Sequence, residues 1–441
     1  MTALGTFGAF AAARVRGSIT PDVQELIKLH TLDTVAAWIA GTRTPEGKRL
    51  LAYRTRLDPG VHADISINCA LARLTEIDDI HLPSMTTPGA FIVPAALSIA
   101  ASLPQSDARA LCEAILAGYE AMTRLGAALD GPRVLYRGIW PSYACAAFGV
   151  AAAAARLMDL TPDEAAHALA LALNLSGAGV GQHGAATTAR WLAAGSAARN
   201  GLQAAQAAQA GFTADLSLLD GRFFPGVYAI TPDLAALTGG LGERSTLTEV
   251  AFKPWCAARQ TMAATQAFKE IIAREIDVDG ITAVEAAVPP LFLRMVDHDV
   301  AEHDRLSRLT SLPYQIAAAV VAPELAFDVV QADEVSPALH AFMAKVKVLP
   351  DETLMEGFPA QWRARVRVEA GGTWHEHLIA QIPGDPGRPF AEADVTEKFH
   401  RLADEIVGAD RVDELCTAVA AVLEGHAAPM QLFGALSRAV G

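Results

Sequence analysis

Long alanine-rich apolar segments restrict most strongly how this chain can fold. Four of them have the length and composition of closely packed helices: Phe91–Leu103, Ala144–Leu157, Leu192–Ala210 and Met262–Ile272. Small side chains allow helix axes to approach one another. We therefore predict that roughly the first 270 residues form one large helical bundle.

Two helices begin with clear N-terminal signals. Thr20-Pro21-Asp22 supplies an N-cap, a proline at the first helical position and an early acidic residue, and the periodic run that follows ends at Gly41. Thr161-Pro162-Asp163-Glu164 repeats this arrangement with the glutamate of a capping box, and Ala165–Leu173 continues the helix.

The pattern changes in the last third of the chain. Short β-branched segments predict strands, and Gly371-Gly372 predicts a hairpin between two of them; the segments are Ile281–Val288, Ala344–Leu349, Arg363–Glu369 and Thr373–Ile382. Helical periodicity returns from Glu392. We predict a mainly α protein with a smaller α+β domain: residues 1–268 and 394–441 form the helical domain and residues 269–393 the α+β domain.

Composition excludes several classes of function. The 441-residue chain is 52% hydrophobic and only 19% charged, with a net charge of −14 and no basic cluster, which argues against a nucleic-acid partner. No window approaches the roughly 18 uninterrupted apolar residues of a membrane span. Residues 1–16 lack the basic start of a signal peptide, so we expect a soluble cytoplasmic protein without a membrane partner.

The cysteines and the absence of common motifs exclude several kinds of site and enzyme class. The five cysteines are scattered without a CxxC pair, so they indicate reduced thiols rather than disulfides or a zinc site. No Gly-x-Ser-x-Gly elbow, P-loop or HExxH motif is present. The glycines of Gly177–Gly184 do not form a dinucleotide fingerprint. After these exclusions, acid–base chemistry on a small anionic substrate is the function class that the sequence favours.

The loop Glu76–Gly89 is the first of the polar clusters that could carry this chemistry. A carboxylate from Asp78 or Asp79 could orient His81 as a general base. Alternatively, the acids cap helix ends and His81 is an ordinary loop residue. An Asp-Asp-x-His metal site is a further alternative, but no additional ligands are spaced to support it.

Two other clusters offer cations. Arg133–Tyr143 combines guanidinium groups with hydroxyls, which suits carboxylate binding by Arg137, although Tyr143 also fits a core position. In Phe252–Thr261, Lys253 and Arg259 lie six residues apart where a helix begins, an arrangement that holds carboxylates. The alternative is that both are solvated charges beside a buried tryptophan.

The order and spacing of many short motifs resemble the MmgE/PrpD family over nearly the full length. The matching segments are Asp78-Asp79, Pro88-Gly89, Val93–Leu97, Arg137-Gly138, Ala147–Gly149, Gly195–Gly201, Gly211–Thr213, Phe252–Pro254, Ser311–Tyr314, Lys345-Val346, Gly384–Pro386 and Lys398-Phe399. This family includes 2-methylcitrate dehydratase, cis-aconitate decarboxylase and iminodisuccinate epimerase.

The resemblance implies a helical domain built from both chain ends, an α+β lid domain, an active site between them and a homodimer. It also implies chemistry α to a carboxylate of a small di- or tricarboxylate, without cofactor or metal. On this basis the catalytic candidates are His81, Lys253, Tyr143 and Asp79, and the substrate-binding candidates are Asp78, Thr87, Arg137, Arg190, Arg259 and Tyr314.

Several positions depart from the family pattern. Thr87-Pro88-Gly89 stands where many members have His-Pro-Gly, and Gly138–Ser142 contains Trp140 where they have a histidine. Arg190-Trp191-Leu192-Ala193 replaces Lys-x-Leu-His, and Ala258-Arg259 follows the turn where a histidine is frequent. The loss of these histidines leaves two interpretations open: a lyase or epimerase, or a non-catalytic carboxylate-binding homologue.

Overall fold

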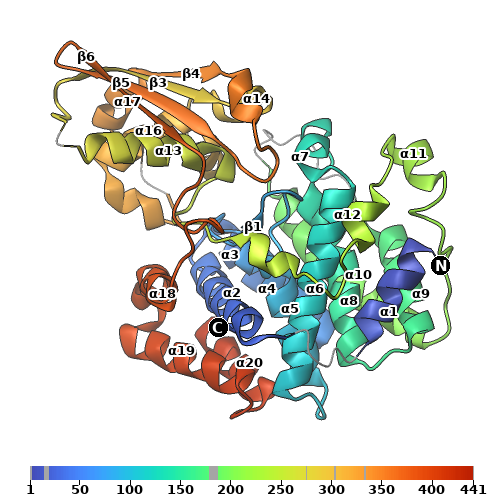
Figure 1. Cartoon of the computed structure of the whole chain (residues 1–441). Coiled ribbons are helices and arrows are strands. Elements are labelled where there is room, and N and C mark those ends of the chain that lie inside the picture. The colour runs from blue at the N-terminus through green and yellow to red at the C-terminus, as the bar shows by residue number, and fades with distance from the viewer. Residues whose placement is uncertain are drawn as a thin grey trace. The chain divides into compact units, whose positions relative to one another are not determined.

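A computed structural model gives the fold and describes residues 2–13, 19–177, 187–274, 276–301, 304–331 and 334–440. These residues form two compact units, whose elements are labelled in Figure 1. The first unit contains the described residues up to Phe252 and those from Phe390 onward. The second contains the described residues of Lys253–Pro389. Both ends of the chain therefore contribute to the first unit.

The first unit is helical, and the capping signals predict where two of its helices begin. Helix α2 (Pro21–Gly41) follows Thr20, whose hydroxyl accepts a hydrogen bond from the Val23 amide. Helix α9 (Pro162–Leu175) begins with a complete capping box between Thr161 and Glu164. Both predictions are confirmed.

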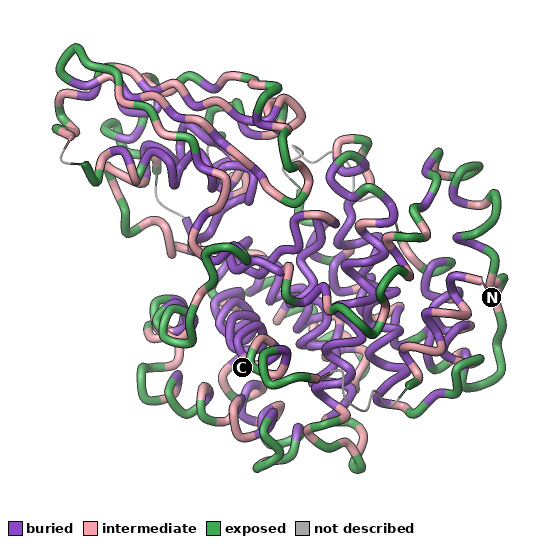
Figure 2. The backbone as a smooth tube through the Cα atoms, in the orientation of Figure 1, coloured by how far each residue is buried: buried purple, intermediate pink, exposed green. Residues whose placement is uncertain are grey.

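Small residues bring the central helices of this unit together. Three of the four alanine-rich segments form α5 (Gly89–Ser102), α8 (Pro141–Leu157) and α10 (Ala189–Gln209), in the region where buried residues are concentrated in Figure 2. A Cβ at Gly201 of α10 would lie 2.5 Å from the Ala147 carbonyl oxygen of α8, so this approach requires glycine. The other helices of the unit are α1 (Ala3–Ala12), α3 (Pro45–Arg54), α4 (Val61–Arg73), α6 (Ala108–Ala128), α7 (Gly131–Val134), α11 (Phe223–Tyr228), α12 (Leu234–Thr238), α18 (Glu392–Val407), α19 (Ala409–Leu423) and α20 (Pro429–Val440), with 3-10 turns η1 (Leu135–Arg137) and η2 (Thr246–Glu249).

A short antiparallel strand pair in the first unit holds the acidic loop. Strand β1 (Ile80–His81) pairs with β2 (Val250–Ala251), with Ile80 opposite Ala251. The loop between α4 and α5 is thereby tied to a segment about 170 residues further along the chain.

The second unit is built on a four-stranded sheet with the order β4-β3-β5-β6. Strand β3 (Ile281–Val288) runs parallel to β4 (Val346–Pro350) and antiparallel to β5 (Ala364–Ala370), and β5 pairs with β6 (Thr373–Ile379). Helix α13 (Arg259–Ile272) packs on β5 and β6, and Figure 1 shows α13 and α16 along one side of the sheet. The other helices of the unit are α14 (Pro290–Val296), α15 (Arg305–Thr310), α16 (Leu312–Val321) and α17 (Pro337–Met343), with 3-10 turns η3 (Pro323–Phe327) and η4 (Glu352–Met355).

The predicted fold class is confirmed, since a large helical unit accompanies a smaller α+β unit. The hairpin predicted around Gly371-Gly372 is the β5–β6 pair. The contacts divide the described chain at 252/253 and 389/390, whereas we predicted 268/269 and 393/394; α13 packs with the sheet rather than ending the helical unit. Residues 178–184 of the glycine-rich stretch lie outside the described residues. In the described part of the chain, no helix is both long and apolar enough to cross a bilayer.

Candidate active site

Asp79 in the loop before α5 is surrounded by protein donors. Its Oδ1 accepts a 2.8 Å hydrogen bond from the Gly89 amide, and its Oδ2 accepts one of 2.8 Å from the Tyr119 hydroxyl. His30 Nδ1 lies 2.9 Å from the same Oδ2. A Cβ at Gly89 would lie 2.8 Å from both Asp79 Oδ2 and the Tyr119 oxygen, so this position has no room for a side chain. These contacts hold the Asp79 carboxylate in place, and its catalytic role stays a prediction.

Lys398 of α18 holds the same loop from another side. Its ammonium group donates a 2.8 Å hydrogen bond to the Ile77 carbonyl and pairs with Asp33 of α2, and both side chains are buried. Burial raises the pKa of Asp33, although the charge of Lys398 opposes this shift. The C-terminal part of the first unit therefore fixes the backbone next to Asp78.

Asp78 belongs to a different group of charges. Arg73, the last residue of α4, donates a 3.0 Å hydrogen bond to Asp78, and its Nη1 also lies 2.9 Å from Glu76 Oε2. Glu76 Oε1 accepts a 2.8 Å hydrogen bond from Arg190 of α10. Burial alone would lower the pKa of Arg73, but the charges of Asp78 and Glu76 raise it, so the guanidinium stays charged. Two arginines and two carboxylates thus form one buried, charge-balanced group.

Arg190 lies against two indole rings. Its guanidinium carbon is 4.4 Å from the ring centroids of both Trp140 and Trp191. Trp140 stacks in turn on Tyr143, with ring centroids 5.7 Å apart. Trp140 and Arg190 occupy two positions at which the sequence departs from the family pattern. The structure brings these two positions into contact.

Five side chains in this region carry hydrogen-bond donors that have no partner among the described residues. Each of these residues is more than nine-tenths buried. The donors are Nε of Arg73 and Arg190, Nε1 of Trp140 and Trp191, and the hydroxyl of Tyr143. A buried donor without an acceptor costs free energy, so a concentration of such donors needs an explanation. We refer to these five residues as the donor cluster.

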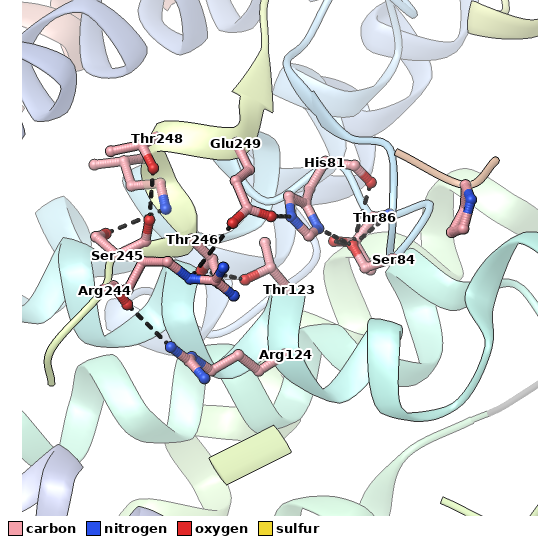
Figure 3. Close-up of polar contacts among 12 residues, drawn as sticks. His81, Ser84, Thr86, Thr123, Arg124, Arg244, Ser245, Thr246, Thr248 and Glu249 are labelled. Atoms are coloured by element: carbon pink, nitrogen blue, oxygen red, sulfur yellow. Dashed lines mark hydrogen bonds and ion pairs between the residues drawn. The ribbon is translucent and has the colours of Figure 1, made fainter. Parts of the chain in front are cut away.

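His81 has protein partners on both ring nitrogens. Its Nδ1 is 2.8 Å from Ser84 Oγ and its Nε2 is 3.4 Å from Glu249 Oε2. Figure 3 shows the ring between Glu249 on one side and Ser84 and Thr86 on the other. The hydrogen bond with His81 lowers the pKa of Glu249. Among the described residues, no group of three or more His, Cys, Asp or Glu side chains is arranged to hold a metal ion.

Thr87 and Arg137 also contact other parts of the first unit. The Thr87 amide donates a 3.1 Å hydrogen bond to Ser142 Oγ, one residue before the donor-cluster tyrosine. Arg137 is exposed, and its guanidinium donates to the carbonyls of Tyr228 and Ala229. The structure therefore brings Thr87 to helix α8, which carries Tyr143, whereas Arg137 holds a surface segment.

The second unit holds the remaining predicted residues, and each of them is buried: Lys253, Arg259 and Tyr314. Arg259 Nη2 donates to both carboxylate oxygens of Asp385, at 2.8 and 2.7 Å. Burial raises the pKa of Tyr314, although Arg308 opposes this shift. Arg259 is thus already engaged by a carboxylate of its own unit.

Comparisons with known proteins match both parts of the chain. Residues 5–234 match the MmgE/PrpD N-terminal domain, and residues 255–422 match the MmgE/PrpD C-terminal domain. The chain belongs to the MmgE/PrpD family. Human cis-aconitate decarboxylase is 22% identical over 94% of this chain and 92% of its own length. Cis-aconitate decarboxylase-like protein oryM of Aspergillus oryzae is 23% identical over 91% and 90%, and cis-aconitate decarboxylase of Aspergillus terreus is 29% identical over 46% and 44%.

Sequence reasoning missed several residues of the site in this MmgE/PrpD protein. Trp140 and Trp191 carried a signal, because they lie within segments where the sequence departs from the family pattern. Glu76 lay in the acidic loop but was not assigned a role. Arg73 is a single charge at the end of an apolar helix, which is only a weak sign of a functional residue. Nothing in the sequence indicated that Tyr119 contacts Asp79.

Proposed function

We propose that this MmgE/PrpD protein is a cofactor-independent lyase or epimerase that removes a proton α to a carboxylate of a small di- or tricarboxylate. The observation that supports this most strongly is the donor cluster. Its five free donors are N–H and O–H groups, and two of them belong to arginines. Such a set suits the oxygens of a carboxylate, which accept hydrogen bonds and carry negative charge.

The cluster offers donors beyond those used within the protein. Arg73 and Arg190 each form an ion pair with Glu76 through part of the guanidinium group, and Arg73 also pairs with Asp78. Their Nε–H groups and the two indole N–H groups have no acceptor among the described residues. A substrate carboxylate would accept hydrogen bonds from donors whose burial without a partner costs free energy. Removing this cost on binding increases the affinity for the substrate.

Proton transfer needs a group that can gain and lose a proton, and Tyr143 is the only such group among the five donors. We assign its hydroxyl, with His81 and Lys253, to the acid–base step predicted from the sequence. The α-proton passes to one of these groups, and the electron pair delocalises into the carboxylate as an enediolate, which cationic and N–H donors stabilise. Loss of a β-substituent then gives a lyase, and return of a proton to the opposite face gives an epimerase.

The test is proton NMR in D₂O with cis-aconitate, citrate, 2-methylcitrate and amino or imino dicarboxylates. We expect loss of an α-proton signal or appearance of a vinyl signal with at least one of them. Arg190→Gln should weaken binding of that compound about 10–100-fold, because a charge-assisted contact contributes about 1.5–3 kcal/mol. The matched control is Arg109→Gln, which also removes an arginine–glutamate pair but on an exposed side chain.

A non-catalytic carboxylate-binding protein is the second candidate. The observation that favours it is Trp140, because an indole at the family's histidine position donates a hydrogen bond but does not exchange protons near neutral pH. Such a protein would be thermally stabilised by a di- or tricarboxylate without any deuterium incorporation. Stabilisation that Arg190→Gln abolishes, with no exchange in any substrate, would reject the enzyme and keep the binding site.

A further inference from the structure

Both nitrogens of the buried His81 ring face polar side chains of the first unit. Nδ1 lies 2.8 Å from Ser84 Oγ, and Nε2 lies 3.4 Å from Glu249 Oε2. His81 itself is only 2% exposed. A proton that the imidazole gains or loses therefore passes through one of these two partners.

The two partners differ in their access to water. Ser84 is fully buried, and its hydroxyl lies 2.7 Å from the hydroxyl of Thr86, which is also fully buried. The Glu249 side chain, in contrast, is 35% exposed. Figure 3 shows the imidazole of His81 between these two ends. The four side chains thus form one hydrogen-bonded row from the solvent to the interior of the first unit.

Glu249 is charged at neutral pH, and this charge selects the tautomer of His81. The hydrogen bond with His81 lowers the pKa of Glu249; partial burial opposes this shift, and the charges of Arg244 and Arg124 support it. Arg244 Nε lies 3.8 Å from the carboxylate. Because a carboxylate only accepts hydrogen bonds, Nε2 of the neutral imidazole carries the ring proton, and Nδ1 accepts from Ser84.

We propose that Thr86, Ser84, His81 and Glu249 form a proton relay between the interior of the first unit and the solvent, with Glu249 as its solvent end. A proton that arrives from Ser84 forms an N–H bond at Nδ1, and the Nε2–H bond breaks as its proton passes to the Glu249 carboxylate. The carboxylic acid then gives this proton to water or to a buffer base. The same transfers in reverse return a proton and restore the starting tautomer.

The relay gives His81 and Glu249 distinct roles. His81 passes on a proton through hydroxyl groups on its buried side, and Glu249 acts through His81, so Glu249 is a positioning residue rather than a catalytic one. The use of the relay in catalysis rests on the function proposed above. The row of hydrogen bonds itself does not depend on the substrate.

Ser84, His81 and Glu249 are also the residue types of a serine hydrolase triad. A nucleophilic serine must reach a substrate carbonyl carbon. Ser84 is fully buried, and its Oγ accepts a 3.2 Å hydrogen bond from the Thr86 amide. A hydroxyl in these surroundings suits the transfer of a proton to the imidazole better than attack on an ester or amide.

Exchange of the His81 ring proton with water tests the relay without a substrate. In protein labelled with ¹⁵N-histidine, NMR measures the exchange rate of the Nε2 proton, and His81→Gln identifies its signal. Glu249→Gln should slow this exchange at least about tenfold, because an amide does not take up a proton near neutral pH. The matched control is Glu270→Gln, which removes the carboxylate 2.8 Å from His377 in the second unit and should leave the His81 rate unchanged.

Rescue by a small carboxylate separates proton transfer from a structural role. In Glu249→Ala the exchange rate should rise in proportion to added acetate, because acetate takes the place of the missing side chain. In Glu249→Gln the amide fills that place, so the rate should stay low. Circular dichroism checks that both variants are folded. An exchange rate that Glu249→Gln leaves unchanged, or a Glu249→Ala variant that does not respond to acetate, would overturn the relay.

A deuterated substrate tests the use of the relay in catalysis. In ordinary water, Glu249→Gln should return the deuterium of an α-deuterated substrate to recovered substrate or product, relative to its loss to water, about tenfold more often than the natural sequence does, with little change in KM. Slowed ring-proton exchange in Glu249→Gln, with no deuterium exchange in any carboxylate, would support the relay and reject the proposed enzyme. Deuterium return that Glu249→Gln does not change would show that the reaction bypasses the relay and would overturn its catalytic use.

Discussion

Two neighbouring regions of the first unit use similar side chains in opposite ways. Around Asp79, a buried tyrosine, a backbone amide and a histidine converge on one carboxylate, and the Tyr119 hydroxyl has its acceptor at 2.8 Å. In the donor cluster, the equally buried Tyr143 hydroxyl has no partner among the described residues. Burial and residue type are the same for the two tyrosines, and only hydrogen-bond satisfaction differs.

On the function proposed above, this difference separates polar groups that serve the fold from polar groups that serve a ligand. The network of Asp79, in which both carboxylate oxygens accept hydrogen bonds from the protein, stabilises one loop conformation. A set of unpaired donors lowers the stability of the fold. Such a set is retained where a ligand supplies the missing acceptors. Substitutions should therefore affect folding in the first region and binding in the second.

The largest effect is expected at the lysine that supports the Asp79 loop. Lys398→Met leaves Asp33 buried without its cation, which should lower the free energy of unfolding by about 3–5 kcal/mol. Because burial already raises the pKa of Asp33 in the folded state, the loss should grow as the pH rises above the carboxyl's unfolded value. Urea unfolding at several pH values measures this. The double variant Asp33→Asn/Lys398→Met should recover much of the loss, and a failure to recover would mean that packing dominates.

Gly89→Ala should have the next largest effect. Its Cβ would lie 2.5 Å from Thr34 Oγ1 and 2.8 Å from Asp79 Oδ2, so the loop must shift, at a cost of about 1–3 kcal/mol. Thermal unfolding measures the loss. The control is Gly177→Ala, where an added Cβ meets no described atom within 4 Å. Equal stability of the two variants would show that the Asp79 network tolerates displacement.

The two tyrosines give the most direct test of the comparison. Tyr119→Phe removes one hydrogen bond from a buried carboxylate and should cost about 1–2 kcal/mol of stability. Tyr143→Phe removes a hydroxyl without a described partner and should change stability by less than about 0.5 kcal/mol. Deuterium exchange into the substrate should respond in the opposite order, with a large loss only in Tyr143→Phe. If Tyr143→Phe destabilised the fold as much as Tyr119→Phe, the donor cluster would be an ordinary part of the core.

The sequence predicted the local features of this fold well. The caps at Thr20 and Thr161 and the glycine pair at Gly371-Gly372 act within a few residues, so their signals are complete in the sequence. Arg190 was predicted to bind a carboxylate, but its pairing with Glu76 spans 114 residues. Such a contact depends on how α10 packs beside the acidic loop. Neighbouring residues do not encode that packing.

Asp78 and Asp79 show most clearly what could not be predicted from the sequence. Sequence reasoning treated them as one acidic motif, because they are adjacent in a loop just before an apolar helix. In the structure Asp78 pairs with Arg73 and Asp79 with Tyr119, His30 and the Gly89 amide. The chain bends at Asp78 before strand β1 begins at Ile80, and the two adjacent acids meet different neighbours. Which neighbours those are follows from tertiary packing.

The smallest expected effect concerns the contact of His81, in strand β1, with Glu249. The hydrogen bond with His81 lowers the pKa of Glu249 in the folded state, so this carboxylate stabilises the fold above its unfolded pKa and ceases to do so as the pH falls through the folded value. Glu249→Gln should therefore cost stability at neutral pH and little in acid. The Glu249 side chain is 35% exposed, so the difference should be at most about 1 kcal/mol. Glu424→Gln, which alters the exposed pair with His426, is the control and should leave the pH profile unchanged. A pH-independent loss in Glu249→Gln would mean that its packing, rather than its charge beside His81, supports the strand pair β1–β2.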